Sequence, residues 1–305
     1  MKLTHLRFFA AFFLLIFLIY TTGVRKFFDT LMCVNLYWAV LAVWTSFLLV
    51  STAVMNVWIL LRTLRPISFE NFFNHYMKSF VVTLLAPGQM GDASLTLFLK
   101  QEGIPIRQSS VVYLLDKTIT LLVFLSVSAW GAEFILPSLN RMWFKFVPAT
   151  GFFVFWAGIL WALKHLPKLS RFPKIQTWLI GAQDTVDVLL KHWPFILLNI
   201  LLAGFKWLLM SLSYFFAFLA FKHVVSWPVI GVIPILSSLV GYIPISLGGI
   251  GVAEGAAVYL FNLQGVEKSV VLSSYILLRL IQFGLAAGLF MFFKKSSSHQ
   301  NYEGR

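Results

Sequence analysis

The sequence predicts an all-α integral membrane protein with six full transmembrane helices and two re-entrant helical hairpins, arranged as an inverted repeat. Three observations favour this fold class. Of the 305 residues, 59% are hydrophobic and only 11% are charged, which is typical of membrane proteins and not of soluble domains. Long apolar runs recur along the chain, and two shorter ones are interrupted by similar clusters of proline and glycine. Interrupted segments at corresponding places in two halves of a chain indicate a transporter binding site.

Six long apolar runs are predicted to cross the membrane. The first follows basic residues, as a signal peptide does, but residues 20–26 contain no small-residue cleavage site, so we expect this span to be retained. The last run ends at Lys294 and Lys295, and the polar residues that follow it, 296–305, are predicted to be disordered. The predicted spans are residues 8–20, 31–61, 109–132, 143–163, 195–221 and 269–293.

The stretch Gly241–Gly255, GYIPISLGGIGVAEG, divides an apolar segment into two parts, each too short for a bilayer, which needs about 20 helical residues. Proline and glycine break a helix, and non-helical backbone at membrane depth must be surrounded by protein or water. We therefore predict a re-entrant hairpin over residues 228–263, and the carboxylate of Glu254 lies just after the break at its tip. The alternative is a loop on the aqueous side between two short helices. The breaking residues are Pro244, Gly248, Gly249 and Gly251.

A second copy of this pattern lies in the first half of the chain. The stretch Leu84–Asp92, LLAPGQMGD, again has an apolar lead-in, a proline, two glycines, Gly88 and Gly91, and a carboxylate. The repetition favours hairpins over isolated loops, and it predicts the first hairpin over residues 70–100.

The two carboxylates are each followed by a cation at the same distance. Asp92 precedes Lys117 by 25 residues, and Glu254 precedes Arg279 by 25 residues. Charges inside a membrane cost about 2.5–3.5 kcal/mol each on insertion scales, and buried ion pairs are poor stabilisers, so their retention indicates function more than structure. An arginine fork suits a phosphate, and a lysine supplies a point charge.

These residues make up the predicted substrate site. The alternative, in which both pairs are internal salt bridges without a ligand, remains open. The predicted substrate-binding residues are Asp92, Lys117, Glu254, Arg279, Gly88, Gly91, Gly248, Gly249 and Gly251, with Asp116 and Lys206 as weaker candidates.

The basic residues predict the orientation in the membrane. If both hairpins return to the side from which they enter, cytoplasmic segments hold 15 of the 24 Lys and Arg, external segments hold six, and three lie within spans. Both termini are then cytoplasmic, in a plasma (cytoplasmic) membrane. Three full spans per unit is an odd number, so the second repeat, residues 139–295, is predicted to be inverted relative to the first, residues 1–138.

Residues 175–192 differ from the predicted spans. Apolar residues recur there at three- and four-residue steps, with Lys174, Gln183, Asp184, Asp187 and Lys191 between them. This pattern predicts an amphipathic helix that lies in the membrane interface or packs on the cytoplasmic face of the protein itself.

Other functional classes leave no trace in the sequence. The single cysteine, Cys33, excludes an internal disulfide, and the six histidines lack metal-ligand spacing. No P-loop, nucleophile elbow or Asp-x-Asp pair occurs. We therefore expect no metal, no cofactor and no enzymatic activity. We attribute the net charge of +13 to positive-inside loops and anionic lipid contacts, not to nucleic acid.

Two motifs carry a family resemblance. PISLGGIGVAEG followed by a helix with Arg279, and PGQMGDA followed by Leu115-Asp116-Lys117, resemble the flippase-like membrane domain of lysylphosphatidylglycerol synthases and its stand-alone relatives. The resemblance covers nearly the whole chain and implies a polytopic helical bundle with re-entrant helices.

The chain departs from that family pattern at three points. The family commonly has Asp-Arg at positions 116–117 and often an arginine within residues 93–96, and this chain has neither. The soluble aminoacyltransferase domain of the large synthases is absent from the sequence, so lysyl transfer is not expected.

Two functions follow from the sequence. The first is a flippase-like transporter that moves an anionic or phosphate-bearing lipid, a phospholipid or a lipid-linked glycan carrier, between leaflets, with a homo-oligomer as one form of assembly. The second is a non-catalytic accessory subunit or an enzyme of lipid-linked glycan or cell-envelope assembly.

Overall fold

The computed structural model describes residues 2–86, 90–135, 145–169, 173–243 and 245–300, and side chains for a smaller set that leaves out Asp92. Within these ranges the fold is all-helical, as predicted. The boundary predicted between the two repeats, at residues 138 and 139, lies outside the described residues.

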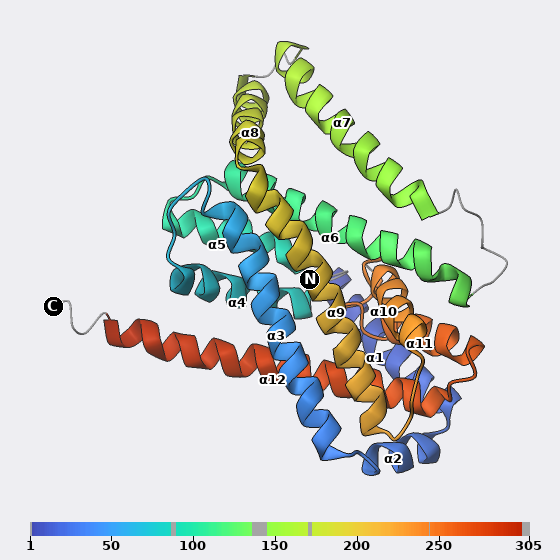
Figure 1. Ribbon diagram of the computed structural model, residues 1–305. Helices are drawn as coiled ribbons and strands as arrows, with labels where there is room; N and C mark the ends of the chain where they lie inside the picture. Colours follow the sequence, from blue (N-terminus) through green and yellow to red (C-terminus); the bar gives the residue numbers. More distant parts are fainter. Residues whose placement is uncertain (1, 87–89, 136–144, 170–172, 244, 301–305) are drawn as a thin grey trace.

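Helices α3 (Leu36–Leu61) and α9 (Trp193–Ala220) run side by side through the middle of the molecule (Figure 1). Polar side chains join them within the apolar seam, and the Ser213 hydroxyl donates to the Thr45 hydroxyl at 3.0 Å. The span predicted to begin at residue 31 begins five residues later. Asn35 is the physical reason, because its side chain accepts the Tyr37 N–H at 3.0 Å and caps the helix there.

Helices α6 (Ile106–Ile135) and α12 (Lys268–Gln300) are the other two long apolar helices. Among the described residues, four helices are long and apolar enough to cross a membrane, namely α3, α6, α9 and α12. Helix α12 continues to Gln300, so residues 296–300 are helical and not disordered as predicted. A helix already formed extends by one hydrogen bond per residue, and no proline or glycine lies between Gly288 and Gly304 to stop it.

The two predicted hairpins are pairs of short helices. The first consists of α4 (Phe69–Leu85), the 3₁₀ turns η1 (Met90–Ala93) and η2 (Lys100–Glu102), and α5 (Ser94–Leu99) between those turns. The second consists of α10 (Trp227–Gly241) and α11 (Val252–Leu263), which pack on each other. The 15 residues of α10 are about 22 Å long, which is less than the ~30 Å hydrocarbon core of a bilayer.

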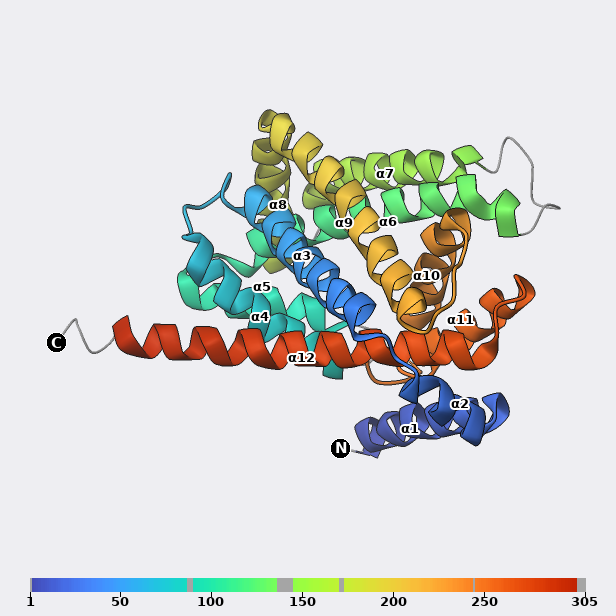
Figure 2. The same cartoon turned by 60° about the horizontal axis from the view of Figure 1, so that its bottom comes forward.

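Helix α12 lies beneath both hairpins. It contacts α4 of the first hairpin and α11 of the second, which lie toward its opposite ends (Figure 2). Their positions agree with the hairpin prediction, but re-entry into a bilayer and the inverted repeat stay predictions.

The remaining predicted spans are less regular. Helix α1 (Lys2–Thr22) meets α2 (Val24–Met32) at an angle of 90° at Gly23, and only the two together reach the length and apolarity of a span. Helix α7 (Val147–Leu169) contains a shorter apolar helix, Val147–Ala162. The described residues therefore contain four candidate spans, or five with the bent pair, and the count of six stays a prediction.

Helix α8 (Pro173–Lys191) occupies the segment predicted to be amphipathic. Ala182, Val186 and Leu189 are buried in the core shared with α6, so this face packs on the protein itself. Trp178 and Leu190 are exposed on the rest of the helix. Contact of that outer face with a membrane interface stays a prediction.

Candidate functional site

The tips of the two hairpins touch. The backbone N–H of Gly248 donates to the carbonyl of Ala86 at 2.8 Å, which joins the breaks in the two halves of the chain. Gly248 has φ +57°, and a Cβ there would lie 2.5 Å from the carbonyl oxygen of Leu84. The contact thus requires glycine for its conformation and for the space.

The other tip glycines also sit in crowded backbone. A Cβ at Gly249 would lie 2.8 Å from the Gly241 carbonyl oxygen, and one at Gly91 would lie 2.4 Å from Thr83 Cα. Gly251, at φ +82°, precedes the first turn of α11. Gly88 lies outside the described residues.

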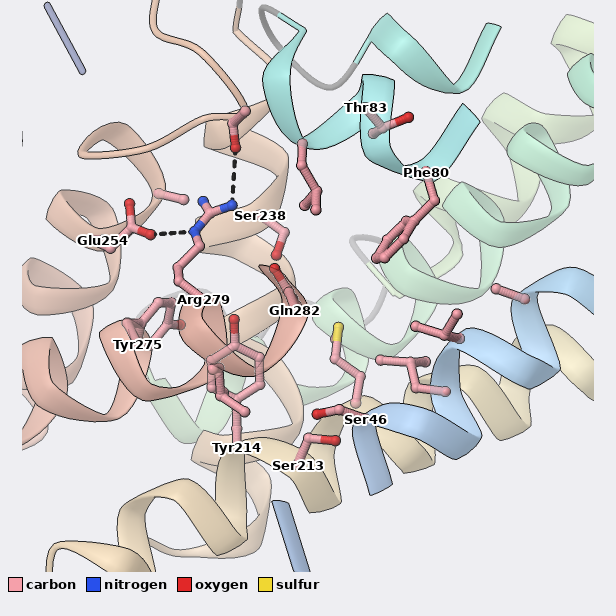
Figure 3. Close-up of a pocket in the computed structure, with 18 of the residues that line it drawn as sticks. Ser46, Phe80, Thr83, Ser213, Tyr214, Ser238, Glu254, Tyr275, Arg279 and Gln282 are labelled. Carbon is pink, nitrogen blue, oxygen red and sulfur yellow. Dashed lines mark hydrogen bonds and ion pairs between the residues drawn. The ribbon is translucent and has the colours of Figure 1, made fainter. Parts of the chain in front are cut away.

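Glu254 and Arg279 form the ion pair that their spacing predicts. Arg279 Nε donates to Glu254 Oε1 at 2.7 Å, and Nη1 of the same guanidinium donates to the Gly248 carbonyl at 3.1 Å (Figure 3). The Glu254 side chain is 1% exposed and that of Arg279 is 19% exposed. Glu254 Oε2 also accepts the Gly251 N–H at 2.7 Å and so caps the N-terminus of α11. One guanidinium and one carboxylate thereby hold α11, α12 and the second tip together.

This pair borders a cavity of about 240 Å³ between the hairpin tips and helices α3, α9 and α12. Thr83 and Leu84 of the first hairpin and Gly248 of the second line it. Figure 3 shows Arg279 between Glu254 and the cavity, with Gln282 one turn further along α12. The cavity therefore offers a cation and hydroxyl groups within apolar walls.

Sequence reasoning missed most of the polar lining. Small polar residues within long apolar helices were a signal for it, because such groups in a membrane need partners inside the protein. Tyr275 also contributes, and its hydroxyl is hydrogen-bonded to that of Ser237 at 2.9 Å. The missed polar residues are Ser46, Tyr76, Thr83, Ser213, Tyr214, Ser238, Tyr275 and Gln282.

The weaker candidates, Asp116 and Lys206, lie together but elsewhere. Asp116 Oδ1 accepts from Asn56 Nδ2 at 2.7 Å and from Asn199 Nδ2 at 3.2 Å. Lys206 Nζ is 3.7 Å from the same oxygen and donates to Thr120 Oγ1 at 2.9 Å. These groups form a buried polar cluster among α3, α6 and α9, and neither Asp116 nor Lys206 lines the cavity beside Glu254.

The predicted pair of Asp92 and Lys117 is described only in part. The Asp92 side chain lies outside the described residues, and the Lys117 ammonium is 5.6 Å from the ring centre of Tyr113. Lys117 is adjacent to Asp116 in sequence but not among the residues that line the cavity. The pairing with Asp92, and the equivalence of the two acid–base pairs, stay predictions.

The described side chains do not form a candidate metal site. No group of three His, Cys, Asp or Glu there is arranged to hold a metal ion. At the cavity, the guanidinium of Arg279 can bind an anion, and nearby hydroxyl groups can donate further hydrogen bonds to it.

Comparison with known proteins agrees with this architecture. A UPF0104 membrane protein of Methanothermobacter thermautotrophicus is 28% identical over 126 residues, which are 41% of this chain and 37% of that protein. The match thus spans little more than a third of the length of that relative. The model of the lysylphosphatidylglycerol synthase transmembrane region matches residues 5–289, nearly the whole chain. The family resemblance predicted from the two motifs is therefore confirmed, and the chain is a multi-pass membrane protein that belongs to the family of the lysylphosphatidylglycerol synthase transmembrane region.

Proposed function

We propose that this protein is a flippase-like transporter that moves an anionic or phosphate-bearing lipid between the leaflets of the cytoplasmic membrane, with both termini in the cytoplasm. The observation that carries the proposal is the buried pair of Glu254 and Arg279 at the place where the two hairpin tips touch. A charge pair at broken backbone inside a membrane protein is typical of a transport site.

The geometry favours a phosphate as the ligand group. Arg279 uses Nε toward Glu254 and Nη1 toward Gly248, and its side chain is the more exposed of the pair. A phosphate in the cavity competes with Glu254 for the planar fork, which can bind two of its oxygens at once. Glu254 thus holds the guanidinium in place when the cavity holds no ligand.

The cavity lining matches a lipid head group. Hydroxyl groups at Ser46, Ser213 and Tyr214 can donate to phosphate or glycerol oxygens, while Leu49 and Phe80 supply apolar wall. A head group that enters such a site leaves its acyl chains in the surrounding hydrocarbon. This arrangement lowers the free-energy cost of moving the polar head group across the membrane, because hydrogen bonds from the protein replace those from water.

The contact between the tips provides the moving part. The hydrogen bond from Gly248 to Ala86 joins two short hairpins, each attached to its own half of the chain. Separation of the tips toward either leaflet opens the cavity on that side, as in the alternating access of repeat-built transporters. An inverted repeat with the two tips near mid-depth is part of this proposal.

The test uses purified protein in liposomes with fluorescent-tailed phosphatidylglycerol, scored by an impermeant quencher outside. Wild-type protein is expected to move the lipid, and Arg279→Gln and Glu254→Gln are expected to abolish movement while the protein still inserts. Lys145→Gln is the matched control, because Lys145 pairs with Glu133 at 2.9 Å and neither residue lines the cavity. If both site variants move lipid as fast as wild type, the proposal is wrong.

The same test addresses the alternative function. An accessory subunit or an enzyme of lipid-linked glycan assembly moves no lipid when purified alone. That result, together with accumulation of an unmodified lipid-linked glycan in cells lacking the protein, would favour the alternative.

A further inference from the structure

The polar cluster of Asp116, Asn56, Asn199 and Lys206 does not line the cavity and has no role in the function proposed above. Its members are nearly inaccessible, with exposures of 2%, 0%, 0% and 7% in that order. They come from α6, α3 and α9, so the cluster joins the three long helices at the centre of the molecule. A buried ionisable group inside a membrane bundle marks an ion or proton pathway more often than a structural element.

Neutral amides make the short contacts to the Asp116 carboxylate. Asn56 and Asn199 donate to Oδ1 at 2.7 and 3.2 Å, whereas the Lys206 ammonium is 3.7 Å from that oxygen, beyond hydrogen-bond distance. Lys206 instead donates to Thr120 at 2.9 Å. The two amides, and not the Lys206 ammonium, are therefore the close hydrogen-bond donors to the Asp116 carboxylate.

Both amides keep an unused acceptor. Asn56 Oδ1 and Asn199 Oδ1 are buried and have no hydrogen-bond partner. An unsatisfied buried acceptor costs about 1–3 kcal/mol, so two of them around one carboxylate require an explanation. An amide turned by about 180° about its last side-chain bond presents oxygen where nitrogen was. It then accepts a hydrogen bond from a carboxylic acid as readily as it donated to the carboxylate.

We propose that Asp116 is a reversible proton-binding site, served in both protonation states by the amide of Asn56. The amide of Asn199 keeps its orientation, because its Nδ2 also donates to the Asn56 backbone carbonyl at 2.8 Å. A hydronium ion transfers a proton to a carboxylate oxygen of Asp116, so one O–H bond of the hydronium breaks, one O–H bond forms on Asp116 and a water molecule leaves. The new O–H donates to the Asn56 amide oxygen turned toward it. The charge of the cluster rises by one, because the carboxylate 3.7 Å from the Lys206 ammonium becomes neutral.

Among the described side chains, few other charges lie on the elements around Asp116, and on α6 itself the next residue is Lys117. Lys206 of α9 faces it, and α3 contributes the neutral Asn56. On α8 the carboxylates Asp184 and Asp187 are exposed on the outer side of the helix. Helix α10 carries no charged residue, α7 has Lys164 and His165 near its C-terminal end, and α5 is followed by Lys100 and Glu102.

The site lies next to the cavity along two helices. Ala53 and Met210 line the cavity, three residues before Asn56 on α3 and four residues after Lys206 on α9. Residues three or four apart share a helix face, so the cluster continues the cavity wall by one turn. Proton binding at Asp116 makes the cluster more positive by one charge, which favours an anion in the adjacent cavity. The proton and an anionic head group thus favour each other, a step that rests on the proposed function.

The proton site is tested by infrared difference spectroscopy of the full-length protein in nanodiscs of phosphatidylcholine, a zwitterionic lipid, during a pH titration. Wild type is expected to gain a protonated carboxylic acid band as pH falls, and Asp116→Asn is expected to lose it. Asp116→Glu should restore a band at a shifted frequency. The double variant Asp116→Asn/Lys206→Met, which removes both charges, controls for folding and should also lack the band. Glu254→Gln should keep it.

The proposal is wrong if the pH-dependent band persists unchanged in Asp116→Asn. It is also wrong if the wild-type spectrum shows no band that this substitution removes. The second arm adds phosphatidylglycerol at fixed pH. A stronger Asp116 band in wild type, and no such increase in Arg279→Gln, supports coupling to the cavity. An unchanged wild-type band rejects the coupling. Because the first arm contains no anionic lipid, failure of the proton site and failure of lipid transport give different results.

Discussion

The ion pair of Glu254 and Arg279 predicts an asymmetric double-mutant cycle. In Arg279→Met, the carboxylate that remains is 1% exposed and lacks its counter-ion. Breaking a buried pair in this way costs about 3–5 kcal/mol of unfolding free energy. In Glu254→Gln, the guanidinium that remains is 19% exposed and can recruit water, while the introduced amide oxygen still accepts the Gly251 N–H. This substitution should cost less than the first.

The double variant Glu254→Gln/Arg279→Met removes both charges together. Its cost should fall well below the sum of the two single costs, with an interaction energy of about 2–3 kcal/mol. The assay is equilibrium unfolding in mixed micelles, followed by circular dichroism, beside the lipid transport assay. All three variants should be inactive in transport, including the stable double variant. Additive stability costs would refute the buried pair, and an active double variant would refute its role in binding.

Three further predictions concern the tips, the pH dependence and the topology. Gly248→Ala should destabilise the protein by about 1–2 kcal/mol from backbone strain and weaken transport by displacing the opposite tip, and unchanged unfolding and transport would contradict the close contact. Glu267 hydrogen-bonds to Ser269 and pairs with Lys26 at 3.0 Å, which lowers the pKa of its carboxyl below the usual range. The folded state therefore gains a small stability above the unfolded pKa and loses it as pH falls through the folded pKa. Glu267→Gln should flatten that acid-side loss in thermal melts, and an equally steep loss in this variant would count against it. A cysteine at position 297 should react with an impermeant reagent only after the cytoplasmic face is opened, whereas one at position 29 should react in intact cells; the reverse pattern would invert the orientation.

Much of the architecture was predictable from the sequence alone. Composition and run length predicted helices that match α3, α6, α9 and α12, because a bilayer demands long apolar helices whatever their neighbours are. Proline and glycine located both hairpin breaks to within a few residues, since these residues act on local backbone. The errors at residues 31–35 and 296–300 concern where helices begin and end. Those boundaries depend on caps such as Asn35 and on continued hydrogen bonding more than on apolarity.

The candidate functional residues likewise include contacts that the sequence predicted and contacts that it did not. The 25-residue spacing predicted that Glu254 meets Arg279, which a hairpin followed by a helix brings about almost locally. The partner of Asp116 was not predictable, because Lys206 and Asn199 are more than 80 residues away in sequence. The residue types identified Asp116 and Lys206 as costly charges in a membrane, but only the packing of α9 against α3 and α6 showed that the two lie together.

The sequence by itself determined that this is a helical membrane protein, that two similar breaks interrupt it, and that Glu254 and Arg279 belong together. Each of these depends on local chemistry or on solvation by lipid, which act on short stretches of chain. Only the tertiary structure decided that the tips touch through Gly248 and Ala86, that serine and tyrosine hydroxyls line the cavity beside them, and that Asp116 lies in a separate cluster. Those facts depend on which helix faces which, and packing between residues far apart in the chain sets that arrangement.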